Sequence, residues 1–259
     1  MIESENPYAS VGRELTGTAF SSIRYVQETG STNDDAAALL GDPKGFGLTI
    51  VAEHQTHGAG RKGRSWIAQP ETSLLFTTIY PRPIAAANLW IVPFAVAVAV
   101  RGSLAANGVP TTLHWPNDLL LGANKIAGIL CATRVVGQQA WVAAGVGINI
   151  RRTPGAEAGI EPPPAFCDDV MPVDRATLLR DILIRYDTWQ DQLNVPQRIA
   201  RVWERHAEIP GKRYVILKDG ETEPFEATAL SLATGGGLVV EHDDGRRETI
   251  SLADARALR

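Results

Sequence analysis

Apolar residues in this chain fall into short runs separated by polar turns, a pattern that predicts a fold built on a sheet. Residues 48–52 read LTIVA, a continuous apolar run of strand length, and residues 23–28 read IRYVQE, a run with β-branched and aromatic positions. Further strands are predicted at residues 73–80, 111–114, 125–135 and 138–150. The connections between the later strands are short, which favours antiparallel neighbours.

Helix-like segments separate these strands. The predicted helices cover about residues 33–40, 88–106, 174–193 and 196–206. Thr32 or Asn33 can cap the first helix and Asp174 the third, because their side-chain oxygens can accept from free backbone N–H groups. The pattern therefore predicts an α+β class, with a mixed, mostly antiparallel sheet and helices packed on one side.

The texture of the sequence changes after Pro210 and Gly211. Four short strand-like runs follow, separated by turns rich in Asp and Gly, at residues 213–217, 223–232, 238–242 and 248–252. This pattern predicts a small barrel. We therefore expect a loosely attached lead-in over residues 1–20, a large domain over 21–208 and a small β domain over 209–259. Residues 151–173 hold five prolines and predict an exposed loop that borders the site.

Composition narrows the class of protein. The 259 residues are 44% hydrophobic and 21% charged, with a net charge of −4, so the whole chain has no attraction for nucleic acid. The longest apolar stretch, residues 89–100, is too short to span a bilayer and predicts a buried helix. Two isolated cysteines and an acidic, polar N-terminus without a secretory pattern favour a cytoplasmic protein without a membrane partner.

Residues 58–66, GAGRKGRSW, predict a phosphate-binding loop, because three glycines space out three positive charges. The same spacing loosely fits a dinucleotide fingerprint and a P-loop, but no helical pattern follows Gly63, and Arg64 stands where a P-loop requires lysine. A solvated basic loop is the alternative that this segment alone leaves open. We also expect the loop to be mobile without ligand, since little in the sequence would hold it.

Four further places along the chain complete a recognisable set. They are Ser31-Thr32-Asn33 followed by Gln55, then His114-Trp115-Pro116-Asn117-Asp118, then Lys125-Ile126-Ala127-Gly128-Ile129-Leu130, and then Gly145-Val146-Gly147-Ile148-Asn149. In this order, with the glycine loop, they resemble the catalytic core of the biotin protein ligases over about residues 20–150. The motifs resemble those of the lipoate ligases less well.

The resemblance implies a class II synthetase-like catalytic domain followed by an SH3-like domain. It also implies a reaction in which biotin and ATP, with Mg²⁺, form biotinyl-AMP, and the biotinyl group then passes to a lysine of an acceptor. The acceptor would be a biotin carboxyl carrier protein or the biotin domain of a carboxylase. Some members carry an N-terminal helix-turn-helix that represses transcription. Such a module does not fit ahead of Ser31, so we expect no DNA binding; monomer and homodimer stay open.

The resemblance also implies site residues. Catalytic roles fall to Lys125, Arg61 and Arg64. Biotin contacts fall to Ser31, Thr32, Asn33, Gln55, Gly58, Ala59, Gly60, Arg61, Trp66, Lys125, Gly128 and Gly145. Nucleotide contacts fall to Arg61, Arg64, Trp66, Asn117, Lys125 and Asn149, and Asp118 is the candidate for Mg²⁺. Ala59 departs from the family's usual G-R-G-R, so an arginine side chain is absent here.

Each of these residues also has a plainer interpretation. Ser31 to Asn33 could simply cap a helix, Lys125 could be the solvated start of a strand, and Trp66 could be a core residue. Gly128 and Gly145 inside apolar strands suggest close approach by a ligand, or a bulge. Asn117 and Asp118 could make an Asx turn. For the whole chain, a lipoate or octanoate ligase and a non-catalytic biotin-binding regulator are the alternatives.

Overall fold

The computed structural model describes residues 6–155, 160, 162–252 and 255–258. Its larger sheet has eight strands in the order β1-β2-β3-β8-β7-β6-β5, and β4 pairs with β8 beside this path. The strands are β1 (Ser22–Thr29), β2 (Leu48–Gln55), β3 (Ser73–Ile79), β4 (Ile84–Ala85), β5 (Thr112–His114), β6 (Asp118–Leu121), β7 (Asn124–Val136) and β8 (Gln139–Asn149). Only the β1–β2 pairing is parallel among the described pairs of this sheet, so the predicted mixed, mostly antiparallel sheet is confirmed.

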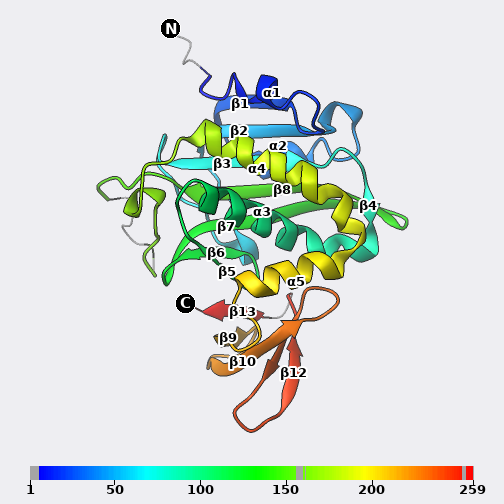
Figure 1. The fold of residues 1–259 in the computed structure, drawn as a ribbon, viewed down its shortest axis with the longest axis vertical. Coiled ribbons are helices and arrows are strands. Elements are labelled where there is room, and N and C mark those ends of the chain that lie inside the picture. The colour runs from blue at the N-terminus through cyan, green and yellow to red at the C-terminus, as the bar shows by residue number, and fades with distance from the viewer. Residues whose placement is uncertain (1–5, 156–159, 161, 253–254, 259) are drawn as a thin grey trace.

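The long helices α3 and α4 cover one face of this sheet, as Figure 1 shows, and α5 packs against α3 beside β5. The α-helices are α1 (Val11–Glu14), α2 (Thr32–Ala37), α3 (Val92–Ala106), α4 (Arg175–Gln190) and α5 (Pro196–His206). The 3₁₀ turns are η1 (Pro43–Gly45), η2 (Arg61–Gly63), η3 (Ala86–Ile91), η4 (Cys167–Asp169) and η5 (Asp191–Asn194). Asp174 caps α4 as predicted, since its side chain accepts from the backbone N–H of Thr177 at 2.8 Å.

The short helix α2 lies on the opposite face of the sheet. Neighbouring residues of a strand point to opposite faces, and Ile50 packs in a small cluster with Ala36 of α2, whereas Val51 packs in the main core with α3 and α4. The expectation of helices on one side therefore holds for the long helices and not for α2. Its N-cap is Ser31 rather than Thr32 or Asn33, because Ser31 Oγ accepts from Asn33 N–H.

Helix α3 supplies the centre of the main core. By length and composition, Ala86–Ala106 could cross a membrane, with a mean hydropathy of 1.8, but 61% of its most apolar window is buried inside the protein. Residues from Val92 to Val100 are almost all inaccessible because α4, α5 and the sheet surround them. The predicted buried helix is confirmed.

The N-terminal segment is part of this core. Tyr8, Val11, Leu15 and Phe20 are each at most 1% exposed and pack in the main cluster. The expectation of a loosely attached lead-in is therefore wrong for residues 6–20, whose apolar side chains were too widely spaced to reveal a helix. Residues 1–5 of that predicted segment lie outside the described residues.

The small C-terminal domain is a five-stranded antiparallel sheet in the order β12-β11-β10-β9-β13. Its strands are β9 (Arg213–Lys218), β10 (Phe225–Leu232), β11 (Leu238–Glu241), β12 (Arg247–Ile250) and β13 (Ala255–Leu258), of which the sequence did not predict the last. It lies below α5 in Figure 1. The buried Trp115 joins the two domains, because its Nε1 donates to the carbonyl of Gly236 at 3.0 Å and its backbone N–H donates to Tyr214 Oη at 3.3 Å.

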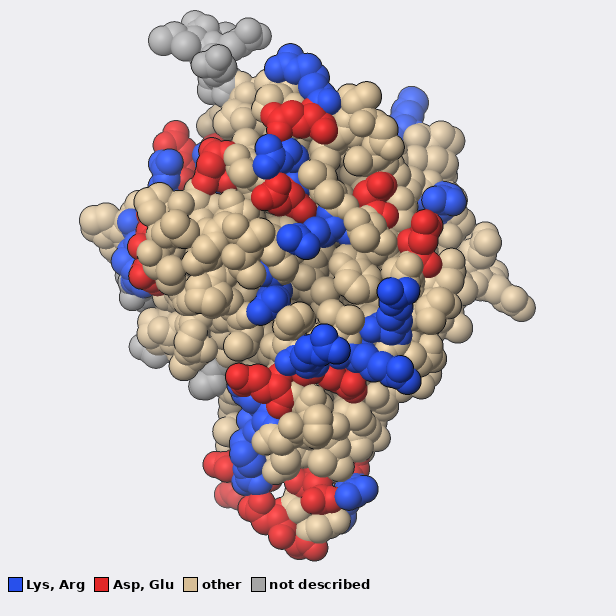
Figure 2. Space-filling view, viewed as in Figure 1, with Lys and Arg blue, Asp and Glu red and all other residues tan. Residues whose placement is uncertain are grey.

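Charge is mixed on the face that carries the long helices. Figure 2 shows Lys and Arg in a band just above the small domain and elsewhere interspersed with Asp and Glu. Apart from that band, this face presents no extended field of one sign.

Candidate active site

A cavity of about 290 Å³ opens between the glycine loop and the strands β3, β7 and β8. All but two of the predicted site residues line it: Ser31, Thr32, Asn33, Gln55, Ala59, Gly60, Arg61, Arg64, Trp66, Asn117, Lys125, Gly128, Gly145 and Asn149. The exceptions are Gly58, which is buried beside the backbone of Trp66, and Asp118, which pairs with Lys125. The five motifs, spread over more than 110 residues of sequence, thus meet at one place.

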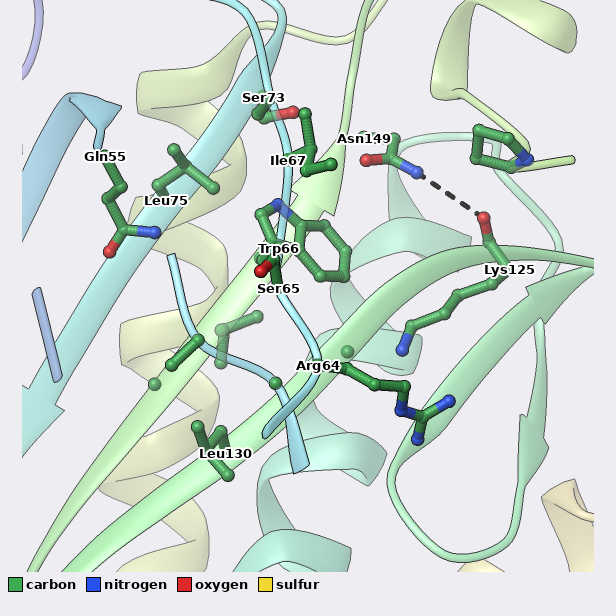
Figure 3. Close-up of a pocket in the computed structure, with 18 of the residues that line it drawn as sticks. Gln55, Arg64, Ser65, Trp66, Ile67, Ser73, Leu75, Lys125, Leu130 and Asn149 are labelled. Carbon is green, nitrogen blue, oxygen red and sulfur yellow. Dashed lines mark hydrogen bonds between the residues drawn. The ribbon is translucent and has the colours of Figure 1, made fainter. Parts of the chain in front are cut away.

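One end of the cavity is a closed network of neutral polar groups. Gln55 Oε1 accepts from the backbone N–H of Thr32 at 2.8 Å and from its hydroxyl at 3.0 Å. Thr77 Oγ1 lies 2.8 Å from Thr32 Oγ1 and donates to Asn33 Oδ1 at 2.9 Å. Asn33 Nδ2 donates in turn to the carbonyl of Leu130 at 3.1 Å. The network fixes the direction of each side chain, and Figure 3 shows the amide nitrogen of Gln55 turned toward Leu75.

Sequence reasoning missed Thr77. It lies on β3 with Ser73 and Leu75, and all three line the cavity at alternate positions of the strand. Alternate residues of a strand face the same side, so this signal was present in the sequence once β3 had been predicted. What the sequence did not show was which side of β3 faces the site.

The glycine loop is a tight hairpin. Ala59 pairs with Ser65, Gly60 N–H donates to the carbonyl of Arg64 at 2.7 Å, and Trp66 N–H donates to the carbonyl of Gly58 at 2.8 Å. A Cβ on Gly58 would lie 2.4 Å from the carbonyl oxygen of Trp66, so only glycine fits there. No helix follows the loop, which confirms that it is neither a dinucleotide fingerprint nor a P-loop.

Three cations reach the cavity and no carboxylate does among its described lining residues. The cations are Arg61, Arg64 and Lys125. Burial lowers the pKa of Arg61, and the nearby positive charge of Arg64 lowers it further. Arg61 still stays charged, because a guanidinium does not deprotonate near neutral pH. A cavity with this set of charges favours an anion.

Lys125 lies against a buried carboxylate. Its Nζ is 2.6 Å from Asp118 Oδ1, and the two side chains are 19% and 10% exposed. The solvated strand start that was the plain alternative for Lys125 is therefore wrong. Asp118 begins β6 and pairs with Gly128, and its carboxylate is directed to Lys125. Asn117 Nδ2 donates to the carbonyl of Ile129 at 2.8 Å, which fixes the other side of this turn.

Trp66 lines the cavity and lies among its labelled residues in Figure 3. A Cβ on Gly147 would lie 2.6 Å from its ring and one on Gly128 3.1 Å, so the two glycines make room for the indole. Lys125 Nζ lies 5.4 Å from the ring centroid, within range of a cation–π contact. The Nε1 of Trp66 is buried and has no hydrogen-bond partner within the described part of the chain.

The glycines of β7 and β8 have protein neighbours. A Cβ on Gly145 would lie 2.2 Å from Asn33 Oδ1, so the close approach expected there is made by Asn33. Gly147, which was not among the predicted site residues, packs against the indole ring of Trp66. Side chains of the protein therefore lie against these glycines, which also line the cavity.

Asn149 closes the far end of the cavity. Its Nδ2 donates to the carbonyl of Ala165 at 3.1 Å and to that of Lys125 at 3.4 Å, the second drawn in Figure 3. Ile160, Pro162, Pro164 and Phe166 lie beside it, so the proline-rich loop borders the site as predicted. Residues 156–159 and 161 of that loop lie outside the described residues.

Comparison with known proteins identifies the family. Residues 25–149 match the biotin/lipoate A/B protein ligase family. A biotin--[acetyl-CoA-carboxylase] ligase of Mycobacterium tuberculosis is 30% identical over 243 residues, which are 86% of this chain and 88% of that protein. The chain belongs to this family, among its biotin protein ligases. A second such ligase, from Paracoccus denitrificans, is 32% identical over 234 residues, 85% of this chain and 94% of that protein.

Solved biotin protein ligases share the fold. The ligase of Aquifex aeolicus in complex with biotin and ATP superposes with a TM-score of 0.74 at 21% identity, covering 93% of this chain and 100% of that one. The ligase of Leishmania major in complex with biotin gives a TM-score of 0.58 at 24% identity, covering 89% and 98%. The predicted class II synthetase-like domain with a small C-terminal β domain is thereby confirmed.

Proposed function

We propose that this chain is an ATP-dependent biotin protein ligase, which activates biotin as biotinyl-AMP and transfers the biotinyl group to a lysine of an acceptor protein. The observation that carries the proposal is the charge distribution in the cavity. Arg61, Arg64 and Lys125 meet there without a carboxylate in the described lining, beside a neutral polar network that ends at Gln55. The names of the relatives support the same reaction.

The first step joins two anions. A carboxylate oxygen of biotin attacks the α-phosphorus of ATP, the bond from this phosphorus to the pyrophosphate oxygen breaks, and pyrophosphate leaves. Positive charge placed between the reactants lowers their repulsion and stabilises the charge that builds on phosphorus. Lys125 takes this role, and Arg61 and Arg64 offer forked donors to the phosphate oxygens. No residue of the protein forms a covalent bond.

The two ends of the cavity hold the two substrates. Ser31, Thr32, Asn33 and Gln55 contact the ureido ring of biotin, whose single carbonyl and two N–H groups require both donors and acceptors. Gly128 and Gly145 belong to the floor beneath it. At the other end, Asn117 and Asn149 contact the nucleotide.

The loop residues cover both substrates. Gly58, Ala59 and Gly60 bring backbone close to biotin, and Trp66 covers the biotin and the nucleotide where they meet. Exclusion of water protects the mixed anhydride from hydrolysis. Ala59 lacks the arginine usual in the family, which leaves Arg61 and Arg64 as the arginines of this loop.

The second step needs a protein acceptor. The uncharged amine of an acceptor lysine attacks the acyl carbon of biotinyl-AMP, an amide bond forms, AMP leaves with the electrons of the acyl–oxygen bond, and the amine loses a proton. The acceptor is a biotin carboxyl carrier protein or the biotin domain of a carboxylase. The reaction belongs in the cytoplasm, where ATP and such acceptors are found together.

Mg²⁺ fits this site as an ion that arrives with ATP. The described residues contain no group of three or more His, Cys, Asp or Glu that could hold a metal by themselves. Mg²⁺ commonly binds one or two carboxylates together with substrate phosphates and water. Asp118 is the candidate carboxylate, although it already pairs with Lys125. When bound, Mg²⁺ would neutralise phosphate charge.

The decisive experiment is mass detection of the acyl-adenylate after incubation with Mg-ATP and either biotin or lipoate. Biotinyl-AMP is expected. Lipoyl-AMP alone would make the chain a lipoate ligase of the same fold, and the absence of both would favour a non-catalytic regulator.

A further inference from the structure

The C-terminal domain touches the glycine loop at two adjacent residues. Lys62 Nζ lies 2.5 and 2.6 Å from the two carboxylate oxygens of Asp219, in the turn between β9 and β10. Arg61 Nη2 donates to the backbone carbonyl of Leu252 at 2.5 Å. Loop residues are therefore tied to a domain about 160 to 190 residues further along the chain. The expectation that little holds this loop is wrong.

The backbone conformation of Lys62 shows why its ion pair with Asp219 matters for the shape of the loop. Its φ of +56° and ψ of +40° lie in the left-handed region, which side-chain-bearing residues rarely adopt. Such conformations persist where surrounding contacts hold them. The Asp219 carboxylate holds the side chain of this same residue, and Gly63 follows with a φ of +72°. The ion pair thus supports the sharp turn that directs Arg61 and Arg64.

The small domain is a firm support for these contacts. Trp115 is fully buried between the domains and bonds to Gly236 and Tyr214, and the backbone N–H of Leu232 donates to Glu204 of α5 at 2.7 Å. The position of Asp219 relative to the cavity is therefore fixed by buried contacts elsewhere. A single ion pair on a firm support can orient a loop even though it adds little to global stability.

Arg61 joins the two domains across the edge of the cavity. Besides Leu252, it contacts Asn117 Oδ1 through Nη1 at 3.5 Å. One guanidinium therefore bridges the turn before β6 and the segment after β12. Because Arg61 lines the cavity, the placement of its charge depends on the C-terminal domain.

From these contacts we infer that Asp219 is a positioning residue for the nucleotide half of the site: the C-terminal domain holds the glycine loop in its binding conformation through Lys62 and Arg61. The inference deepens the proposed function and rests on it for its effect on ATP. Its effect on the loop itself does not depend on catalysis.

The test uses the full chain with Asp219→Asn, because asparagine keeps the turn chemistry of aspartate and removes only the charge. Trypsin cleavage after Arg64, followed by mass spectrometry, is expected to speed up about two- to five-fold, the size appropriate to a partly exposed ion pair. The KM for ATP should rise by a similar factor while that for biotin changes less. Asp243→Asn is the matched control, since Asp243 pairs with Arg213 inside the small domain.

A charge exchange makes the test specific. Lys62→Glu alone should speed cleavage after Arg64. Adding Asp219→Lys should return the cleavage rate toward that of wild type. The single and the double variant have the same residues around the cut, so the difference between their rates reports the restored ion pair. Equal cleavage of Asp219→Asn and wild type, or no rescue in the exchange variant, would overturn the inference. If wild type makes no biotinyl-AMP, the proposed function fails, and the cleavage rates still decide the role of Asp219.

Discussion

Lys125 Nζ lies 2.6 Å from Asp118 Oδ1, at the edge of a cavity whose described lining holds no carboxylate. The pair explains how a lysine can stay in a mostly enclosed site before an anionic substrate arrives. A charge buried alone is costly, and a close counter-ion with good geometry offsets that cost. The same contact holds the Lys125 ammonium group, which extends from β7, next to Trp66 of the glycine loop.

Replacing Lys125 with alanine should reduce the rate of biotinyl-AMP formation by about 10²- to 10³-fold, the usual loss when one charged donor at a developing oxyanion is removed. The measurement is single-turnover formation of the adenylate at saturating substrates. Lys44→Ala is the control, because Lys44 is exposed and does not line the cavity. A Lys125→Ala rate within a factor of three of wild type would contradict the assigned role.

Replacing Asp118 with asparagine should lower the free energy of unfolding by about 3 kcal/mol, since it leaves the charge of Lys125 without its counter-ion. Urea unfolding measures the change. The double variant Asp118→Asn with Lys125→Gln should recover most of the stability and none of the adenylate formation. Recovery of both would show that the pair serves stability alone.

The hydroxyl of Thr77 gives a prediction about biotin. Thr77→Val keeps the shape of the side chain but removes the group that links Thr32 Oγ1 to Asn33 Oδ1. The lost bonds should lower the free energy of unfolding by about 1–2 kcal/mol and raise the KM for biotin, because Asn33 and Thr32 lose their fixed directions.

The next residue of the same strand is a matched control. Thr78 is also buried and bonds through its hydroxyl to Thr49 Oγ1 at 3.0 Å, but on the other side of β3 from the cavity. Thr78→Val should lose similar stability without changing the KM for biotin. If both variants raise that KM equally, the effect comes from the strand as a whole and the network has no direct role.

The pKa of His206 makes the free energy of unfolding depend on pH. Burial, together with the positive charges of Arg101 and Arg205, lowers the pKa of His206 below its usual value of 6.5. The unfolded chain therefore takes up this proton at a higher pH than the folded protein. Its contribution to stability is complete above about pH 6.5 and is lost as the pH falls toward the folded-state pKa. Urea unfolding between pH 5 and pH 8 measures this decline.

Arg205→Ala should raise the pKa of His206, measured by NMR titration, and recover about 0.5 kcal/mol or less at pH 5, because Arg205 is exposed. Arg201, another exposed arginine of α5, does not contribute to the shift and serves as the control. An identical His206 titration in the two variants would rule out the electrostatic cause.

The sequence predicted elements wherever local signals were strong, and failed where tertiary packing decides. The cap at Asp174, the helix α5 and the strands β7 and β8 follow from local chemistry and periodicity. The packing of Tyr8 and Phe20 into the core does not, because isolated aromatic residues have no period. Likewise, glycine composition predicted close approach at Gly145, but only three-dimensional structure shows that Asn33 is what approaches.

The same limit applies to the site. Five motifs identified most of the residues around the cavity, since each motif lies on an element that reaches it. Contacts between distant segments, such as Lys62 with Asp219 and Thr77 with Asn33, leave no mark on either segment alone. The structure supplies these pairs, and they are the ones that orient the motif residues.

Gly147 and Trp66 provide the last prediction. A Cβ at residue 147 would lie 2.6 Å from the indole ring, so Gly147→Ala should displace Trp66 from its place against β8. Overpacking of this kind costs roughly 1–3 kcal/mol, and the KM for biotin should rise about two- to ten-fold if half of that cost falls on the bound state. Gly30→Ala is the control, because the nearest atom to its added Cβ, His57 Nδ1, is 4.0 Å away.

A double-variant cycle separates the steric cause from a general disturbance of β8. Trp66→Leu removes most of the ring that the new methyl group would meet, so Gly147→Ala should change the KM for biotin much less in that background. If Gly147→Ala has the same effect with and without the indole, the glycine is required by the strand or by the ligand itself, and the packing of Trp66 on Gly147 is not what shapes the biotin site.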